Sequence, residues 1–292
     1  MATPIGLFPF VTDYSMPVHE LAMAAEARGF ESIWVPEHTH IPASRRTPYP
    51  GGGELPLEYS HTLDPFVALA AVATVTKTIK LGTGICLLVE RDTITTAKTV
   101  ATLDQISNGR VLLGLGAGWN REEMENHGTA WASRFRKLEE QMQALRAIWA
   151  AEVSSFHGQF VNFDSIWSWP KPTQRLPPIQ VAEATSATVA GVPLILGGDT
   201  DRTLQRIVQF ADGWLPIARD PVKVLDDLAK LRRYAEAAGR SMSSISVSVF
   251  APPPKTVEQF LDTEADRVVL QIPPANADDT LRRLDRYAAF VR

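Results

Sequence analysis

The chain has 292 residues, of which 45% are hydrophobic and 21% are charged, and its formal net charge is -4 at pH 7. This length is enough for one large α/β domain or two ordinary domains, and we predict a single domain over residues 1–292. The weak negative charge, without any long basic run, gives no electrostatic footprint for nucleic acid or an anionic membrane.

Cysteine content and the first residues bear on the compartment. Cys86 is the only cysteine, so the sequence has neither a disulfide framework within the chain nor a cysteine metal cluster. Residues 1–10 lack the basic and long apolar regions of a signal peptide, and no apolar stretch reaches the roughly 18 residues of a membrane span. These features predict a cytoplasmic protein.

Short apolar runs alternate with helical patterns along most of the chain. The apolar runs predict strands at residues 5–10, 32–36, 79–88, 110–116, 192–197, 214–217, 245–250 and 267–272. Helical periodicity and helix-end signals predict helices at residues 17–28, 64–76, 93–107, 134–151, 202–211, 222–238, 256–263 and 278–290. Strands that are apolar throughout are typical of a parallel sheet covered by helices.

Eight such units most economically close into a (β/α)8 TIM barrel, with long loop insertions. An open doubly wound sheet is the competitor, but its G-x-G-x-x-G fingerprint is missing after the first strand. The insertions are residues 39–61, rich in Pro and Gly, and residues 154–189, both predicted as long loops of the kind that form lids. Trp167 and Trp169 in the second insertion could wall a pocket or pack under the loop, and we favour packing.

Polar residues follow the second predicted strand. Glu37, His38 and His40 would lie at the C-terminal ends of the strands, where barrel active sites are built. A histidine here could instead be a hydrogen-bonded loop residue, and a His-x-His pair could belong to a barrel metallohydrolase. A metal site needs further ligands from later strand ends, and the other four histidines do not fall there (His19, His61, His127 and His157).

Glycine-rich segments mark three further strand ends. "LGTGICL" at residues 81–87 indicates a bulge or a close backbone approach to a ligand, or else a kink for barrel closure. "GLGAGW" at residues 114–119 is a weak nucleotide-loop pattern that places Trp119 at a strand end. Residues 197–200, Gly-Gly-Asp-Thr, open a helix whose N-terminus suits a phosphate, although a simple helix cap is the alternative and the aspartate adds a like charge.

Taken together, these segments resemble the bacterial luciferase-like monooxygenase family, and more closely its branch of coenzyme F420-dependent oxidoreductases. The resemblance covers roughly residues 5–220. It is carried by "GFESIWVPEH", "KLGTGICLLVERD", "TAKTVATLDQISNGRVLLGLGAGWNREEME", "FHGQFVNF", "PKPTQRLPPI" and "LILGGDTDRTLQRIVQFADGWLP".

The resemblance implies a (β/α)8 barrel that binds coenzyme F420, or alternatively flavin mononucleotide (FMN). It implies a cis peptide bond between Gly84 and Ile85, behind the central ring of the cofactor. It assigns His38 and Glu37 to catalysis, with His38 giving or taking a proton and Glu37 orienting it or contacting the ring. The cofactor-binding residues that it implies are Thr83, Gly84, Ile85, Trp119, Gly197, Gly198, Asp199 and Thr200.

The implied function is hydride transfer between F420 and a small organic substrate. Two alternatives stay open: an FMN-dependent monooxygenase that uses O2 with a separate reductase, and a non-catalytic flavin-binding homologue. Trp119 stands where the deazaflavin sugar-phosphate dehydrogenases carry a catalytic glutamate, which indicates a more apolar pocket. Residues 182–192 separate "PPIQV" from the glycine pair, so the identity of the fifth barrel strand is open. The family commonly dimerises through outer helices, and residues 93–107 could serve in a homodimer.

Overall fold

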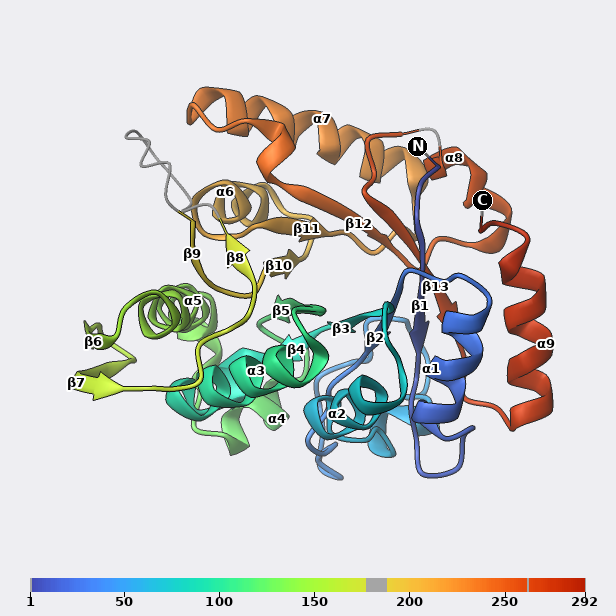
Figure 1. The fold of residues 1–292 in the computed structure, drawn as a ribbon, viewed down its shortest axis with the longest axis horizontal. Helices are drawn as coiled ribbons and strands as arrows, with labels where there is room; N and C mark the ends of the chain where they lie inside the picture. The colour runs from blue at the N-terminus through green and yellow to red at the C-terminus, as the bar shows by residue number, and fades with distance from the viewer. Residues whose placement is uncertain (1, 177–187, 262, 292) are drawn as a thin grey trace.

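The parallel strands close into a barrel in this computed structural model, which describes residues 2–176, 188–261 and 263–291 (Figure 1). Around the barrel the strands are β1 (Ile5–Pro9), β2 (Ser32–Val35), β3 (Lys80–Thr83) with β4 (Cys86–Leu87), β5 (Val111–Gly116), β10 (Leu194–Gly197), β11 (Gly213–Leu215), β12 (Ser246–Phe250) and β13 (Arg267–Ile272). The ring is complete because β10 pairs in parallel with both β11 and β5. The predicted (β/α)8 barrel is confirmed.

Helices follow the strands and cover the outside of the barrel, with α9 and α1 on one side and α5 on the other (Figure 1). The helices are α1 (Val18–Ala27), α2 (Pro65–Val75), α3 (Thr93–Ser107), α4 (Arg121–Asn126), α5 (Arg134–Ala150), α6 (Asp201–Phe210), α7 (Pro221–Ala237), α8 (Glu258–Leu261) and α9 (Ala277–Ala288). The helix expected over residues 256–263 is shorter, because residues 254–256 form a separate 3-10 turn, η5 (Pro254–Thr256). Within the described residues, no helix is both long and apolar enough to span a membrane.

Polar side chains start several of these helices where the sequence places them. Asp64, Asp92, Asp220 and Asn276 each accept a hydrogen bond from an amide in the first turn of the helix that follows. A helix leaves its first amides without partners, so these caps fix where each helix begins. The residue at which each of these helices begins is therefore determined by the sequence next to it.

Two buried clusters divide the core. The larger one joins the outer faces of the strands to the helices. The smaller one fills the barrel with Phe8, Phe10, Trp34, Leu112, Ile195, Leu215, Phe250 and Val269. Side chains on a strand alternate between its two faces, and the inward set packs the interior instead of leaving a pore. The half-buried Tyr59, Ile85 and Ala251 lie against this inner cluster.

The open question of the fifth strand is resolved by β10. Leu194 pairs with Leu113 of β5 and Gly197 with Leu215 of β11, so β10 is the fifth barrel strand. This agrees with the strand predicted at residues 192–197. The segment "PPIQV" at residues 177–181 lies outside the described residues.

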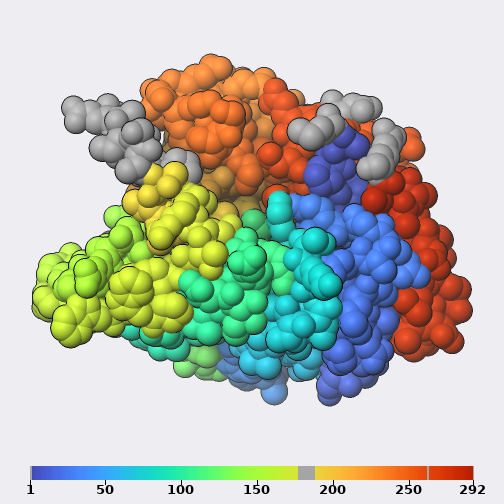
Figure 2. Space-filling view, in the orientation of Figure 1, coloured from blue at the N-terminus to red at the C-terminus, as the bar shows by residue number. Residues whose placement is uncertain are grey.

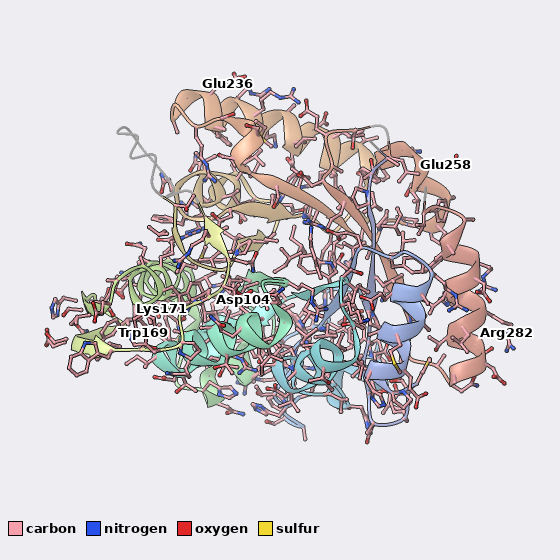
Figure 3. All side chains as sticks on the ribbon, viewed as in Figure 1. Asp104, Trp169, Lys171, Glu236, Glu258 and Arg282 are labelled. Carbon is pink, nitrogen blue, oxygen red and sulfur yellow. The ribbon has the colours of Figure 1, made fainter. Side chains whose placement is uncertain are left out.

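The second insertion is not the structureless loop that we expected. It contains an antiparallel hairpin, β6 (Val153–His157) with β7 (Asn162–Trp167), and a short pair, β8 (Arg175–Leu176) with β9 (Val189–Ala190). The hairpin projects at the left of Figure 2, coloured yellow-green. Trp167 and Trp169 are 75% and 55% exposed, so the packing interpretation was wrong (Figure 3 labels Trp169). Phe163 of the hairpin belongs to the buried core, and Phe156 and Ile166 are partly buried against it.

Glu26 at the end of α1 ties the chain just before β3 to the barrel. Its carboxylate accepts hydrogen bonds from the amides of Lys77 at 2.9 Å, Thr78 at 2.6 Å and Ile79 at 2.9 Å. Burial by itself raises the pKa of Glu26, but these amides outweigh it and lower the pKa from 4.5 to about 2. A lowered pKa stabilises the fold above the unfolded value near 4.5, and the stabilisation is lost as the pH falls toward 2.

We therefore expect Glu26→Gln to lower the free energy of unfolding by about 1 kcal/mol at pH 7, a discounted value because the side chain is partly exposed. The deficit should shrink by pH 3, where wild-type Glu26 has begun to lose its advantage. Urea unfolding at both pH values measures this. Glu20→Gln on the exposed face of the same helix is the control. A deficit that stays constant from pH 7 to pH 3 would contradict the role of the charge.

Candidate active site

The C-terminal end of β2 carries Glu37 and His38, whose side chains have different surroundings. Glu37 is 4% exposed, and its carboxylate accepts hydrogen bonds from the amide of Leu87 at 2.7 Å and from Nε of Arg91 at 2.6 Å. Arg91 also pairs with Asp64 at 2.8 Å. Glu37 thus joins the end of β2 to the end of β4. It is not the partner of His38, one of the two roles that the resemblance allowed.

His38 is held by a residue that the sequence did not single out. Its Nδ1 lies 2.7 Å from Oε2 of Glu123 on α4, and the other oxygen, Oε1, accepts from the amide of Thr39 at 3.0 Å. Glu123 is 0% exposed. Helix α4 starts directly after β5, so its first turn lies at the same end of the barrel as the end of β2. An acidic residue is also favoured in the first turn by the helix dipole.

Aromatic rings surround the other side of His38. Tyr59 lies 5.3 Å and Trp119 5.8 Å from His38, measured between ring centroids. Tyr49 is 5.2 Å from Tyr59 and 6.0 Å from Trp119. Tyr49 and Tyr59 come from the insertion at residues 39–61, which therefore folds over the end of the barrel. Together with Trp119 they form an apolar wall beside the imidazole, which we call the aromatic wall.

Helix α4 also fixes this insertion. Glu122, next to Glu123, accepts from the amides of Arg46 and Thr47 at 3.2 and 3.3 Å and from the hydroxyl of Thr47 at 2.7 Å. His127, at the end of the same helix, has Nε2 2.7 Å from Oγ1 of Thr39. His127 was not among the predicted site residues, because it does not follow a predicted strand directly. Its position four residues after Glu123, on the same face of one helix, was the available signal.

The floor of the site lies at the bulge that follows β3. The peptide bond between Gly84 and Ile85 is cis, as the resemblance predicted. Leu81 and Gly82 pair with Val111 and Leu112, whereas Cys86 pairs with Leu115, so this segment holds one more residue than β5 between the two paired blocks. Such an insertion is a β-bulge, which re-aims the chain near a site.

Glycines leave room around this floor. A Cβ on Gly116 would lie 2.7 Å from Cδ1 of Ile85, and one on Gly197 would lie 3.6 Å from Cγ2 of Ile85. Ile85 therefore lies between the ends of β5 and β10, and a side chain at Gly116 would displace it. Thr83 is buried, and its hydroxyl donates to the carbonyl of Gly114 at 2.7 Å, which links β3 to β5.

The glycine pair after β10 leads into α6. Thr200 caps this helix, because its Oγ1 accepts from the amide of Thr203 at 3.2 Å. Gly198 has a φ of +113°, a conformation that L side chains rarely adopt. Within the described residues, the amides of Gly198 and Asp199 donate no backbone hydrogen bond. Exposed amides at a helix N-terminus form an anion site.

Asp199 by itself would repel a phosphate, but Lys223 of α7 forms an ion pair with it. Its Nζ lies 2.8 Å from Oδ2 of Asp199 and 2.5 Å from Oδ2 of Asp227. The ammonium is half-exposed and lies beside the loop that precedes α6. Lys223 therefore compensates the charge of Asp199 at the edge of the anion site.

These features fit a flavin or deazaflavin. An apolar floor of Ile85 over the inner aromatic cluster suits a flat ring system, and the glycines at the ends of β5 and β10 keep side chains out of its way. The exposed amides before α6, with Lys223 at their edge, suit its phosphate. A metal centre has no comparable set: across residues 2–176, 188–261 and 263–291, no group of three or more His, Cys, Asp or Glu side chains could hold an ion.

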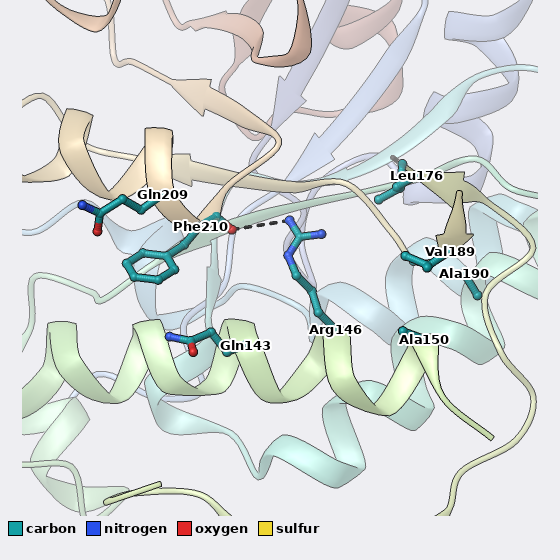
Figure 4. Close-up of a pocket in the computed structure, with 9 residues that line it drawn as sticks. Gln143, Arg146, Ala150, Leu176, Val189, Ala190, Gln209 and Phe210 are labelled. Atoms are coloured by element: carbon teal, nitrogen blue, oxygen red, sulfur yellow. Dashed lines mark hydrogen bonds between the residues drawn. The ribbon is translucent and has the colours of Figure 1, made fainter. Parts of the chain in front are cut away.

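A cavity of about 400 Å³ lies elsewhere (Figure 4). It is lined by α5, α6 and the β8–β9 pair, and Arg146 crosses it to reach the carbonyl of Phe210 and the carboxylate of Asp212. Asp212 precedes β11, so this cavity belongs to the N-terminal end of the barrel. That end contributes stability in this fold, whereas chemistry is located at the other end.

Comparisons with known proteins identify the family of this chain. A family model described as luciferase-like monooxygenase matches residues 14–254, and the chain belongs to this family. An uncharacterised protein of Mycobacterium tuberculosis is 36% identical over 292 residues, 97% of each chain. An F420-dependent hydroxymycolic acid dehydrogenase of the same organism is 30% identical over 229 residues, which are 77% of this chain and 55% of that protein. The monooxygenase RslO1 from Streptomyces bottropensis has a similar fold, with a TM-score of 0.73 and 18% sequence identity. The match covers 99% of this chain and 98% of that chain.

Proposed function

We propose that this protein is an F420-dependent oxidoreductase that acts on a small organic substrate at the C-terminal end of the barrel. The observation that carries the proposal is the position of His38, whose Nδ1 is held by Glu123 while its ring lies against the aromatic wall. When bound, F420 supplies two-electron hydride transfer at C5. The protein supplies position and, in the imidazole of His38, a proton donor or acceptor.

Each group of residues then has a separate task. Gly84 and Ile85 support the ring from below, with room left by Gly116 and Gly197. The amides of Gly198 and Asp199, with Lys223 beside them, hold the phosphate. His38 exchanges a proton with the substrate on the side of the aromatic wall.

The aromatic wall also constrains the substrate. Tyr49, Tyr59 and Trp119 offer ring faces and two hydroxyl groups, which bond to each other at 3.2 Å. Arg45 lies over Trp119 at 5.6 Å and is the cation on this wall. We infer a mostly apolar substrate instead of a sugar phosphate.

An FMN-dependent monooxygenase is the second candidate, and the monooxygenase among the structural neighbours favours it. That likeness is one of fold, whereas the F420-dependent dehydrogenase shares sequence over three quarters of this chain. Titrating the purified protein with F420 and with FMN, while recording fluorescence, separates the two. We expect F420 to bind more tightly. Tighter binding of FMN would favour the monooxygenase, and binding without oxidation of reduced cofactor by any acceptor would indicate a non-catalytic homologue.

Lys223 provides a matched test of the phosphate site. Lys223→Met removes the cation next to Asp199 and should weaken F420 binding about fivefold, or ~1 kcal/mol, because the pair is half-exposed. Lys230→Met is the control: it lies on the same helix and also pairs with Asp227, at 2.9 Å, but its other partner is Asp201 inside α6. Equal dissociation constants for the two variants would contradict this phosphate site.

We also propose that the chain is one cytoplasmic domain that forms a homodimer. Helices α2 and α3 lie next to each other and expose Val67 at 73%, Ile94 at 38% and Ile106 at 52%. A second copy would remove such side chains from water, which is favourable. Sedimentation of a monomer at micromolar concentration would contradict the dimer.

A further inference from the structure

The contact between His38 and Glu123 determines more than the position of the ring. A histidine whose Nδ1 faces a carboxylate must carry its hydrogen there, because a carboxylate only accepts hydrogen bonds. The distance of 2.7 Å is that of a charge-assisted bond. Within the described residues, Nε2 of His38 has no hydrogen-bond partner, and the rings next to the imidazole are those of the aromatic wall.

Glu123 has no freedom to turn away. One of its oxygens faces Nδ1 of His38 and the other accepts from the amide of Thr39 at 3.0 Å. The side chain is fully buried, and in the described part of the chain no other cation lies within ion-pair distance of it. A buried carboxylate needs a charged or donating partner, and here the imidazole is that partner.

The neighbouring ionisable groups leave Glu123 as the carboxylate partner of His38. Glu90 is a second buried carboxyl; burial first, and then the charges of Glu123 and Glu37, raise its pKa to about 9, while Arg91 and Lys137 oppose the shift. His127 also faces Glu90, with Nε2 3.8 Å from Oε2. At neutral pH Glu90 is therefore protonated and does not compete with Glu123 for a proton or a cation. Arg91 is occupied by Glu37.

We propose that Glu123 is the positioning residue for His38: it fixes the tautomer that carries hydrogen on Nδ1 and so leaves Nε2 to exchange the proton at the substrate. This inference rests on the proposed function of His38. When Nε2 takes a proton from the substrate, the ring becomes an imidazolium and its positive charge is balanced by Glu123, which itself takes up no proton. When Nε2 gives the proton back, the ring returns to the same neutral tautomer.

The amide of Thr39 makes the test decisive. In Glu123→Gln, the side chain must still accept from this amide, so its oxygen faces Thr39 and its NH2 group faces Nδ1 of His38. Nδ1 must then accept, and the hydrogen moves to Nε2. The substitution keeps size and burial but reverses the tautomer. Glu125→Gln is the matched control, because Glu125 lies on the same helix, is exposed and pairs with Arg121.

Long-range 1H–15N spectra of the histidine side chains, recorded on the full chain without cofactor, report the tautomer directly. We expect hydrogen on Nδ1 of His38 in the wild type and in Glu125→Gln, and hydrogen on Nε2 in Glu123→Gln. With reduced or oxidised F420 and an accepted substrate, kcat of Glu123→Gln should fall on the order of 10²–10⁴-fold while KM changes less than about threefold. Glu123→Asp, which keeps the carboxylate, should recover part of kcat.

The outcomes are distinguishable. Hydrogen on Nε2 of His38 in the wild type would overturn the proposal without any variant, and so would an unchanged tautomer in folded Glu123→Gln. If the tautomer reverses but the turnover of Glu123→Gln and of His38 variants stays at the wild-type level, positioning by Glu123 stands and the catalytic role of His38 fails.

Discussion

His38→Asn should lower turnover about 10²–10⁴-fold, the range typical of removing a general acid or base. The asparagine amide can still donate to Glu123, which would otherwise be left buried and unpaired, but it cannot transfer a proton at neutral pH. F420 binding should change less than about threefold, because floor and phosphate residues are untouched. Steady-state turnover and cofactor fluorescence, measured separately, check the two halves of this expectation.

His157→Asn is the control for this substitution. His157 also faces a carboxylate, that of Asp164 at 3.1 Å, but it lies on the exposed β6–β7 hairpin. The turnover of His157→Asn should equal that of the wild type. His38→Ala adds a second test, since it should lose turnover equally and also lose stability by leaving Glu123 without its partner. Wild-type turnover in folded His38→Asn would remove His38 from catalysis.

Arg91→Met should lower the free energy of unfolding by about 3–5 kcal/mol, the usual cost of leaving a buried charge without its partner. Arg91 donates to Glu37, whose side chain is 1% exposed, and also lies over the ring of Phe66 at 4.7 Å. Methionine keeps most of the packing volume but removes the charge. Only the amide of Leu87 would then remain for the carboxylate among the bonds described here.

Two further variants isolate the cause of this loss. The double variant Arg91→Met/Glu37→Gln should recover at least half of it, because position 37 then no longer holds a buried charge without a partner. Arg282→Met, which breaks an exposed pair with Asp279, should cost less than about 1 kcal/mol. Chemical unfolding measures all three. A double variant as unstable as Arg91→Met would show that packing, and not the unpaired carboxylate, is responsible.

The order of strands and helices, and the barrel that they form, could be predicted because the sequence signals for each element are local. Apolar strands, capping residues such as Asp64 and Asp92, and helical periodicity lie within a few residues of each other. The buried face of α5 contains Leu138, Met142, Leu145 and Trp149, as its period requires. A parallel barrel then follows, since eight strand–helix units leave few other ways to bury these faces.

The predictions failed where a short sequence pattern is compatible with two different environments for the same side chain. The tryptophans of the second insertion were interpreted as packing residues, but Trp167 at the end of the projecting hairpin and Trp169 just after it are both exposed. Glu122 and Glu123 are neighbours of the same chemical type. One binds the insertion at Thr47 and the other binds His38, a difference set by which face of a single helical turn meets β2.

The sequence by itself determined the barrel and the residues at its strand ends, where we place the candidate site, because these depend on periodicity, caps and motif order. Only the tertiary structure decided which side chains meet. Glu37 turns to Arg91, and His38 turns to Glu123, 85 positions further along the chain. The reason is physical: the contact joins the end of β2 to the first turn after β5, and closure of the barrel creates that proximity.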